Sequence, residues 1–434
     1  MALQLNGDHS IGRYGSGPKK FERRKWKMSN KISRWRLRLA MTGLAGIVTC
    51  ASPVASAAAQ SAAIVQQAAP VDTGSSADRD PARNADLLPT SRYVAPVDIE
   101  FHGASFISQG VRLTSQWFVA KDNAQKKLPT IIMGHGWGAT AAAFRLDAIA
   151  LARIGYRVML FDYRGWGDSD GRVVLVSGIK GGVPVGFQGS EFDAKVKELR
   201  GYVDPEEQSD DWFNAISFAV SQPGVDVDRI GIRGSSYSGG YVGYVAALDK
   251  RVKAVVSQVG SFNSTPEARG VPDPARDRAE ANLNATKLTT GEIGYPPERL
   301  RVNNLTGVSP GNDRMRWNPM EVLHNVTQPM LFVLAEKEEM FPNDRQGFIA
   351  CGLVAGPRKA VIVPEILHHD IYGSERELAI AEAIDWFDKY LKPPGAQTRI
   401  SVNRKEPERG DCHASFIRPE GVGAPEREPF VPPQ

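Results

Sequence analysis

The chain has 434 residues, which is enough for one large domain or several small ones with a sizeable buried core. Apolar residues make up 42%, charged residues 24%, and the formal net charge is only +4, so composition argues against global disorder and against a dedicated nucleic-acid binder. The 3 cysteines cannot supply a disulfide framework and form no C-x-x-C motif.

The N-terminal segment has the pattern of a secretory signal. A basic run at 19–38 is followed by an apolar stretch at 39–54 and by the small-residue sequence 55–57. This order predicts a signal peptide over residues 1–57 that is cleaved after Ala57, with translation starting at Met28. An uncleaved membrane anchor is the alternative, but the stretch is short and rich in Ala, Gly and Thr for a membrane span.

Removing the signal changes the charge of the chain. Residues 1–57 hold eleven basic and two acidic residues, so the remaining chain has 42 basic and 47 acidic residues and a formal charge of −5. We therefore expect an exported, mildly acidic protein with no nucleic-acid partner. Cys50 leaves with the signal, so Cys351 and Cys412 remain as a possible pair.

The rest of the chain divides by composition. Residues 58–90 predict a flexible linker, and residues 393–434, with eight prolines, predict a disordered or loosely attached tail. Residues 91–392 then suit one large domain. Two insertions interrupt it, one at about 174–203 and a cap at about 262–325, and we expect them to set substrate specificity.

Strand and helix patterns alternate through this domain. Buried strands are predicted at 128–136, 156–165, 228–236, 252–260, 329–337 and 359–366, and helices at 141–154, 206–222, 239–248 and 376–391. This alternation predicts an α/β fold with a mostly parallel central sheet covered by helices on both faces. Residues 97–120 alternate apolar and polar side chains, which predicts antiparallel edge strands. Ligands in such sheets bind at the carboxyl ends of the strands.

Ser236 is the predicted nucleophile. The strand ending at Arg233 turns through Gly234-Ser235-Ser236-Tyr237-Ser238-Gly239-Gly240 into a helix. A serine exposed on a tight strand-to-helix turn needs small residues two positions away on each side, and Gly234 and Ser238 meet that need. Ser238 departs from the glycine of the strict G-x-S-x-G pattern. Ser235 and Ser238 are alternative nucleophiles, and an ordinary Gly/Ser loop is the alternative without chemistry.

The predicted general base lies among seven histidines. His368 and His369 follow the last buried strand, where an imidazole can reach a serine on a neighbouring strand end. His9 and His413 lie in the terminal segments, and we expect His135 to be structural. Two adjacent histidines on a surface loop also occur without function.

The predicted acid and oxyanion donors come from two further loops. Glu338 follows the fifth buried strand and would orient the imidazole, with Glu339 and Asp344 as alternatives. Two backbone N–H groups should stabilise the oxyanion, one from Tyr237 and one from Trp137 in the loop after the first buried strand.

Five segments together resemble the α/β-hydrolase superfamily, and more narrowly its acyl-esterase, dienelactone-hydrolase-like and Xaa-Pro dipeptidyl-peptidase-like branches. They are HGWG from 135, FDYRGWGDSDG from 161, DRIGIRGSSYSGG from 228, NPMEVLHNVTQPMLFVLAEKEEMFP from 318 and LHHDIYG from 367. In these relatives the histidine segment often reads H-Y-D-I-Y, which favours His368 over His369. The acid often appears as E-K-D-E, which places Glu338 where Asp is common. The segment from Asp162 to Gly165 is expected to brace loops.

The resemblance implies a secreted serine hydrolase that cleaves a carboxylic ester through an acyl-enzyme, using Ser236, His368 and Glu338. The expected partner is a small ester or acyl compound, and no cofactor or metal is expected; HExxH is absent, and Asp168-Ser169-Asp170-Gly171 is only a fragment of a calcium loop. An amidase or Xaa-Pro-like peptidase with the same triad is the nearest alternative. A non-catalytic binding protein is the other, because Ser238 and Glu338 depart from the pattern.

Overall fold

A computed structural model describes residues 88–175, 193–290, 317–396, 398, 408–410 and 412. The chain divides into two units, Met1–Thr73 and Gly74–Gln434, and every described residue belongs to the second. The predicted signal at 1–57 and most of the predicted linker lie outside the described residues.

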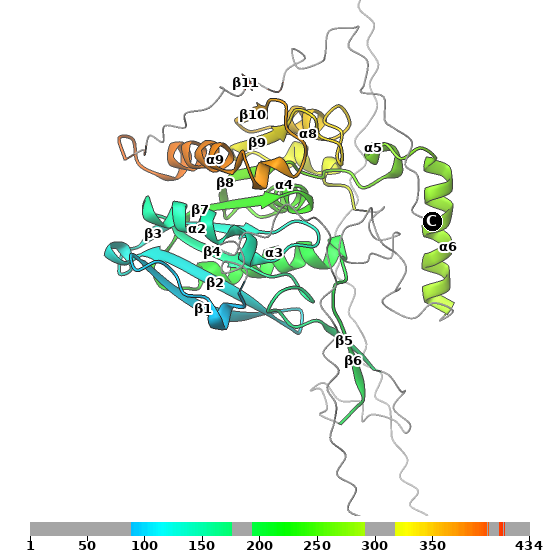
Figure 1. The fold of residues 1–434 in the computed structure, drawn as a ribbon, viewed down its shortest axis with the longest axis horizontal. Coiled ribbons are helices and arrows are strands. Elements are labelled where there is room, and N and C mark those ends of the chain that lie inside the picture. Colours follow the sequence, from blue (N-terminus) through cyan, green and yellow to red (C-terminus); the bar gives the residue numbers. More distant parts are fainter. Residues whose placement is uncertain are drawn as a thin grey trace, which may run out of the picture. The chain divides into compact units, whose positions relative to one another are not determined.

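A mixed sheet forms the centre of the described unit (Figure 1). Its nine strands in the described residues run in the order β1-β2-β4-β3-β7-β8-β9-β10-β11. Neighbours from β4 to β10 are parallel, whereas β1, β2 and β11 join antiparallel at the two edges. The strands are β1 Ile99–Ser108, β2 Val111–Ala120, β3 Leu128–Gly134, β4 Arg157–Phe161, β7 Val225–Ser235, β8 Val252–Gln258, β9 Met330–Ala335, β10 Arg358–Val363 and β11 Glu408–Gly410. The α/β fold and the antiparallel edge expected from the sequence are both present.

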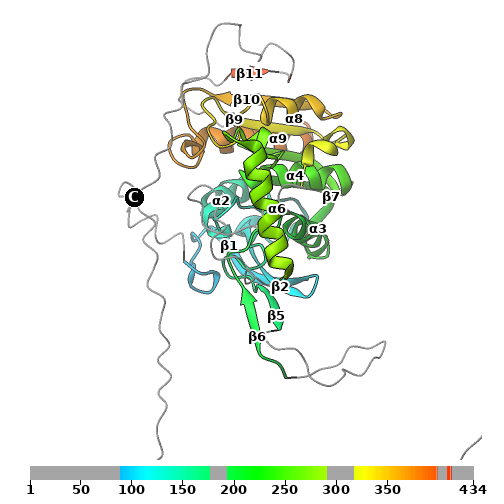
Figure 2. The ribbon, with the colours of Figure 1, turned by 90° about the vertical axis from the view of Figure 1, so that its right-hand side faces the viewer.

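Helices cover both faces of the sheet (Figure 2). Alternate side chains of the strands contribute to two separate cores: Ile132 and Val255 pack on one face, and Ile131 and Val256 on the other. The first face is covered by α3 Pro205–Val220, α4 Tyr237–Leu248 and α8 Gly347–Leu353, and the second by α2 Arg145–Arg153 and α9 Arg376–Leu391. Since both faces are covered, the parallel strands carry the apolar runs that the sequence displays.

Two strands at the two ends of the first predicted insertion pair with each other as an antiparallel hairpin. Strand β5 Arg172–Leu175 pairs with β6 Val196–Leu199, and residues 176–192 between them lie outside the described residues. Val173, Leu175 and Val196 are exposed on this hairpin. The hairpin therefore contributes little buried apolar surface of its own.

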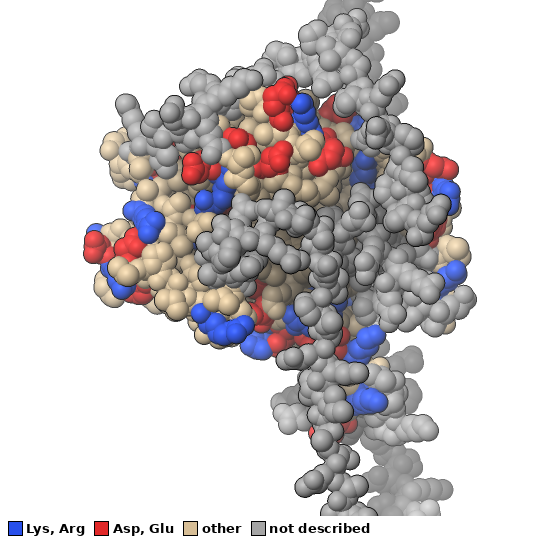
Figure 3. Space-filling view, viewed as in Figure 1, with Lys and Arg blue, Asp and Glu red and all other residues tan. Residues whose placement is uncertain are grey.

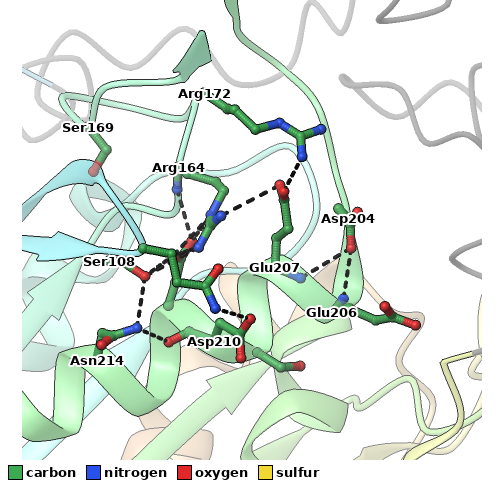
Figure 4. Close-up of polar contacts among 12 residues, drawn as sticks. Ser108, Arg164, Ser169, Arg172, Asp204, Glu206, Glu207, Asp210 and Asn214 are labelled. Atoms are coloured by element: carbon green, nitrogen blue, oxygen red, sulfur yellow. Dashed lines mark hydrogen bonds and ion pairs between the residues drawn. The ribbon is translucent and has the colours of Figure 1, made fainter. Parts of the chain in front are cut away.

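A network of charged side chains anchors the base of this hairpin (Figure 4). Arg164 is buried and pairs with the fully buried Asp211 of α3 at 2.6 Å. Ser108 at the end of β1 donates to the same carboxylate at 2.6 Å. Arg172 at the start of β5 pairs with Glu207, which also lies near Arg164. Arg164, which lies in the segment predicted to brace loops, is thus linked to both α3 and the base of the hairpin through this network.

The predicted cap contains two α-helices in its described part. They are α5 Pro266–Arg269 and α6 Pro274–Thr290, and residues 291–316 lie outside the described residues. Gly270 joins them in a left-handed conformation with φ 67°, and Arg269 pairs with Asp277 across this joint. Arg278 of α6 also pairs with Glu267 of α5 at the surface.

Part of the C-terminal segment differs from the predicted loose tail. Residues 408–410 form β11 on the edge of β10, and Cys412 forms a disulfide with Cys351 of α8, with Cα atoms 5.5 Å apart. The disulfide joins the two cysteines that the sequence left as a possible pair, and this covalent link attaches the segment to α8.

The described surface has a mixed charge. On the face in Figure 3, basic and acidic side chains are interspersed, and the described part of that face carries no basic stripe. No helix within the described ranges combines the length and hydropathy needed to cross a bilayer.

Candidate active site

The predicted site residues lie at one edge of the sheet. Ser236 directly follows β7, Glu338 follows β9, and His368 follows β10. Trp137 follows β3, which pairs directly with β7. Because these strands are parallel, their carboxyl ends meet at the same edge.

Ser236 occupies a strained turn between β7 and α4. Its backbone has φ 57° and ψ −125°, a conformation that costs an ordinary residue energy and persists only where its surroundings enforce it. The carbonyl of Gln258 accepts the Ser236 N–H at 2.8 Å, and the Ser236 carbonyl accepts from Gly239 and Ser261. A Cβ at Gly234 would lie 2.1 Å from the Ser238 carbonyl oxygen, so the turn requires glycine there.

Ser238 fits where the strict pattern has glycine because its hydroxyl has a partner. Its Oγ lies 2.7 Å from the Tyr163 hydroxyl, and the Trp212 indole N–H donates to that hydroxyl at 2.8 Å. Ser238 and Tyr163 are both buried. Because Tyr163 accepts from Trp212, its own proton is available for Ser238, and the buried serine is satisfied.

His368 joins the serine to a carboxylate. Its Nε2 lies 3.0 Å from Ser236 Oγ, and its Nδ1 lies 2.8 and 2.9 Å from the two Glu338 oxygens. An ionised carboxylate only accepts hydrogen bonds, so the imidazole proton belongs on Nδ1. Nε2 then presents its lone pair to the Ser236 hydroxyl.

The structure distinguishes the three acidic candidates. Glu338 contacts the imidazole, and its Oε1 also accepts the N–H groups of Met340 and Phe341 at 3.0 and 3.1 Å. The Glu338 side chain is only 2% exposed. Glu339 accepts the main-chain N–H of His368 at 2.8 Å, whereas Asp344 is exposed on the following turn. The two adjacent glutamates therefore hold the same histidine at two different atoms.

Further hydrogen bonds join the acid loop, residues 336–341, to the histidine loop, residues 364–369. Glu336 accepts the N–H of Glu365 at 2.7 Å, and the Lys337 N–H donates to the Ile366 carbonyl at 2.9 Å. Glu365 has a positive φ of 66°, which this pairing holds in place. The two loops thus form one hydrogen-bonded unit around His368.

The loop after β3 passes directly beside the nucleophile. A Cβ at Gly136 would lie 2.7 Å from the Ser236 Cβ, so glycine allows this close approach. The Trp137 ring packs edge-on against the Tyr237 ring with centroids 5.1 Å apart. The two residues assigned as oxyanion donors therefore flank Ser236.

His135 is buried away from the triad. Its Nδ1 lies 2.9 Å from the Gly136 carbonyl, and burial lowers its pKa to about 4. Burial raises the pKa of the neighbouring Asp162 carboxyl to about 6. Asp162 accepts the N–H groups of Ala141 and Asp168. Both side chains hold the loops around the site, which agrees with a structural role for His135.

The alternative nucleophile Ser235 and the other histidines do not take part in the contact between Ser236 and His368. Ser235 contacts Tyr372 at 2.8 Å, and His369, His102 and His324 are exposed. His9 and His413 lie outside the described residues. In the part of the chain that the structure describes, no group of three or more His, Cys, Asp or Glu side chains is arranged to hold a metal ion.

Sequence reasoning missed several residues that support the site. Gln258, at the end of β8, holds both the Ser236 N–H and the Ser235 hydroxyl. Tyr372 lies in the quoted segment LHHDIYG, but its contact with Ser235 joins residues 137 positions apart. Nothing local in the sequence indicates that pairing.

A mostly parallel sheet covered by helices, with Ser236 on the turn between β7 and α4, is the arrangement of the α/β-hydrolase fold. A family model for the X-Pro dipeptidyl-peptidase (S15 family) matches residues 109–271, which include Ser236. The solved structure of the alpha/beta hydrolase GrgF from Penicillium aligns with TM-score 0.51 and 19% identity, and covers 67% of this chain and 99% of that chain. This likeness shows the α/β-hydrolase fold for the chain.

Two relatives extend the comparison to sequence. An uncharacterized 31.7 kDa protein of Escherichia coli, from the traX-finO intergenic region, is 27% identical over 315 residues, which cover 66% of this chain and 98% of that protein. Thiohydrolase aneE of Aspergillus aculeatus is 29% identical over 203 residues, which cover 46% of this chain and 54% of that protein. The similarity to the E. coli protein thus extends over about two thirds of this chain and nearly the whole of that protein.

Proposed function

We propose that the chain is an exported serine hydrolase that cleaves a small carboxylic ester through an acyl-enzyme. The observation that carries this proposal is the continuous series from Ser236 Oγ through the His368 imidazole to the Glu338 carboxylate, with bonds of 2.8 to 3.0 Å. A strained serine joined to a base whose second nitrogen is held by an acid is the arrangement that activates a hydroxyl nucleophile.

Each residue has a defined role in the proposed reaction, and His368 acts first as a base and then as an acid. His368 Nε2 takes the Ser236 proton as Oγ attacks the ester carbonyl, and Glu338 stabilises the resulting imidazolium. The backbone N–H groups of Trp137 and Tyr237 bind the developing oxyanion. The imidazolium then protonates the leaving alcohol, and water, activated by His368, hydrolyses the acyl-enzyme.

Labelling with an organophosphonate tests the nucleophile. Such a probe should modify Ser236 and abolish turnover of a chromogenic acyl ester, and Ser236→Ala should lose both labelling and the burst of product. Ser235→Ala is the matched control and should still be labelled. Equal turnover by Ser236→Ala and the unmodified protein would contradict the assignment.

Peptide-bond cleavage is the second candidate activity. It is favoured by the match of residues 109–271 to the X-Pro dipeptidyl-peptidase family model. The same triad forms an acyl-enzyme from an amide, so the two activities differ in the substrate accepted and not in the nucleophile. A panel of short-chain esters and Xaa-Pro amides compared by kcat/KM distinguishes them, and we expect the esters to be preferred.

Export is the remaining part of the proposal. It is supported by the basic and apolar pattern of residues 1–57 and by the disulfide between Cys351 and Cys412, since such bonds persist in oxidising compartments. Expression of the full chain in a bacterium should yield a periplasmic or secreted product that begins after Ala57. A mature product that retains this segment in the membrane would instead indicate an anchor.

A further inference from the structure

A series of hydrogen-bonded side chains runs from Arg233 through Gln258 and Ser235 to Tyr372, and it ends beside the nucleophile. Arg233 donates to the Gln258 side-chain oxygen at 2.7 Å, and the Gln258 amide donates to Ser235 Oγ at 3.0 Å. Ser235 Oγ in turn lies 2.8 Å from the Tyr372 hydroxyl. Arg233, Gln258 and Ser235 are each no more than 2% exposed. The proposed reaction assigns no role to this series.

The chemistry of the groups fixes the direction of these bonds. A guanidinium only donates, so the Gln258 oxygen faces Arg233 and its amide nitrogen faces Ser235. Ser235 therefore accepts from Gln258 and has one proton to donate. Its two acceptors are the Gln258 carbonyl at 3.4 Å, which already accepts the Ser236 N–H, and the Tyr372 oxygen at 2.8 Å. The shorter bond to the less occupied oxygen is favoured.

This direction leaves the Tyr372 proton to be donated elsewhere. Burial is the largest influence on the pKa of Tyr372 and raises it, whereas the hydrogen bond with Ser235 and the nearby Ser236 hydroxyl lower it. The phenol thus keeps its proton near neutral pH and lies beside both serines. Ser236 Oγ donates its own proton to His368, so the lone pairs of Oγ remain available to accept a hydrogen bond from another donor.

We propose that Tyr372 is a further catalytic residue, whose hydroxyl donates a hydrogen bond to Ser236 Oγ at the end of the series from Arg233. This inference rests on the proposed function of the triad. Before attack, the bond would point the Ser236 proton at His368. When the acyl-enzyme is hydrolysed, the C–Oγ bond breaks, Oγ takes the electron pair, and His368 returns the proton. Tyr372 stabilises the charge on Oγ during that transfer and keeps its own proton.

The charged end of the series is held from its other side. Arg233 pairs with Asp147 at 2.6 Å, and Asp147 pairs with Arg376 at the start of α9 at 2.6 Å. The guanidinium is therefore fixed in place and points one N–H at Gln258. Fixed, prealigned dipoles of this kind are effective because they need no rearrangement as charge develops.

Removing single hydroxyl groups tests the proposal. In Tyr372→Phe we expect kcat for a chromogenic ester to fall about tenfold to a hundredfold with little change in KM, as for a hydrogen bond to a charged group. Ser235→Ala should reduce kcat about threefold to tenfold, as for a neutral hydrogen bond. The double variant should be no slower than Tyr372→Phe, because both changes interrupt one series.

A structural role for Tyr372 predicts a different pattern. Tyr156→Phe is the matched control, since it removes a buried phenol hydroxyl bonded to Asp388 at 2.7 Å. It should lower Tm and leave kcat unchanged. Wild-type kcat in Tyr372→Phe, or effects of Tyr372→Phe and Ser235→Ala that multiply in the double variant, would overturn the proposal. If Tyr372→Phe does not fold, Ser235→Ala decides alone, and an unchanged kcat would overturn it.

The organophosphonate probe keeps the two proposals separate. Labelling of Ser236 in both the wild-type protein and Tyr372→Phe, together with equal kcat values, would remove the role of Tyr372 and leave the triad intact. Failure of the probe to label Ser236 in the wild-type protein would instead contradict the proposed function itself.

Discussion

The loops that carry the triad and the insertions beside them are held in different ways. The acid loop and the histidine loop are joined by main-chain and side-chain hydrogen bonds, and the Glu338 and His368 side chains are 2% and 1% exposed. The hairpin β5–β6 and the helices α5–α6 instead carry several ion pairs between exposed or partly exposed side chains. The difference indicates that the chemistry has a rigid support and that the insertions can vary with little effect on it.

The largest effect should come from replacing Glu338, and the adjacent Glu339 serves as the comparison. In Glu338→Gln the new side-chain amide can donate to His368 Nδ1 and so favour the tautomer whose Nε2 cannot accept from Ser236. We therefore expect Glu338→Gln to lower kcat about a thousandfold to ten thousandfold. Glu339→Gln keeps an oxygen that accepts the His368 N–H and should lower kcat less than about tenfold. Steady-state kinetics with one ester measures both, and the reverse order would make Glu339 the acid.

The second effect concerns the buried ion pair between Arg164 and Asp211 at the base of the first insertion. Asp211→Ala leaves the Arg164 guanidinium buried without its 2.6 Å partner, so we expect unfolding to become easier by about 3 to 5 kcal/mol. Glu198→Ala removes the exposed pair with Arg200 and the hydrogen bond from the Gly171 N–H on the same hairpin, and should cost less than about 2 kcal/mol. Urea denaturation measures both. Similar losses in the two variants would show that the buried pair does not anchor the hairpin.

The sequence predicted the regions that local pattern controls. The buried parallel strands and their helices have apolar runs and helical periods, and the order of the motifs assigned Ser236, Glu338 and His368 to the ends of three parallel strands. The pairing of Tyr372 with Ser235, the accommodation of Ser238 by Tyr163, and the attachment of β11 could not be predicted. Each depends on contacts between distant segments, for which a single sequence carries no local signal.

A third effect depends on pH and tests whether the buried His135 side chain is uncharged in the folded protein. The pKa of His135 is lowered from 6.5 to about 4 by burial, so the unfolded chain binds a proton there before the folded protein does. Folding stability is therefore lost as pH falls from 6.5 toward 4, by up to about 3 kcal/mol. Asp162, whose pKa is raised to about 6, has the opposite slope between pH 3.8 and 6.

Replacing His135 isolates its contribution. His135→Asn keeps Asp162, so the difference in unfolding free energy between the variant and the wild-type protein should shrink as pH falls from 6.5 to 4. His324→Asn, which removes an exposed histidine, is the control and should leave the pH dependence unchanged. Parallel stability curves for His135→Asn and the wild-type protein would mean that the folded protein protonates His135 as readily as the unfolded chain does.

The smallest effects should lie in the cap, where two arginines differ in burial. Arg278 pairs with Glu267 at the surface, and both side chains are about half exposed, so we expect Arg278→Ala to leave Tm and ester kinetics unchanged. The Arg269 side chain is only 12% exposed, donates to the Ser264 carbonyl and pairs with Asp277. Arg269→Ala should therefore loosen the joint at Gly270 and change KM for bulky esters more than for small ones, with kcat retained. A fall in kcat equal for all esters would instead mean that the cap supports the triad itself.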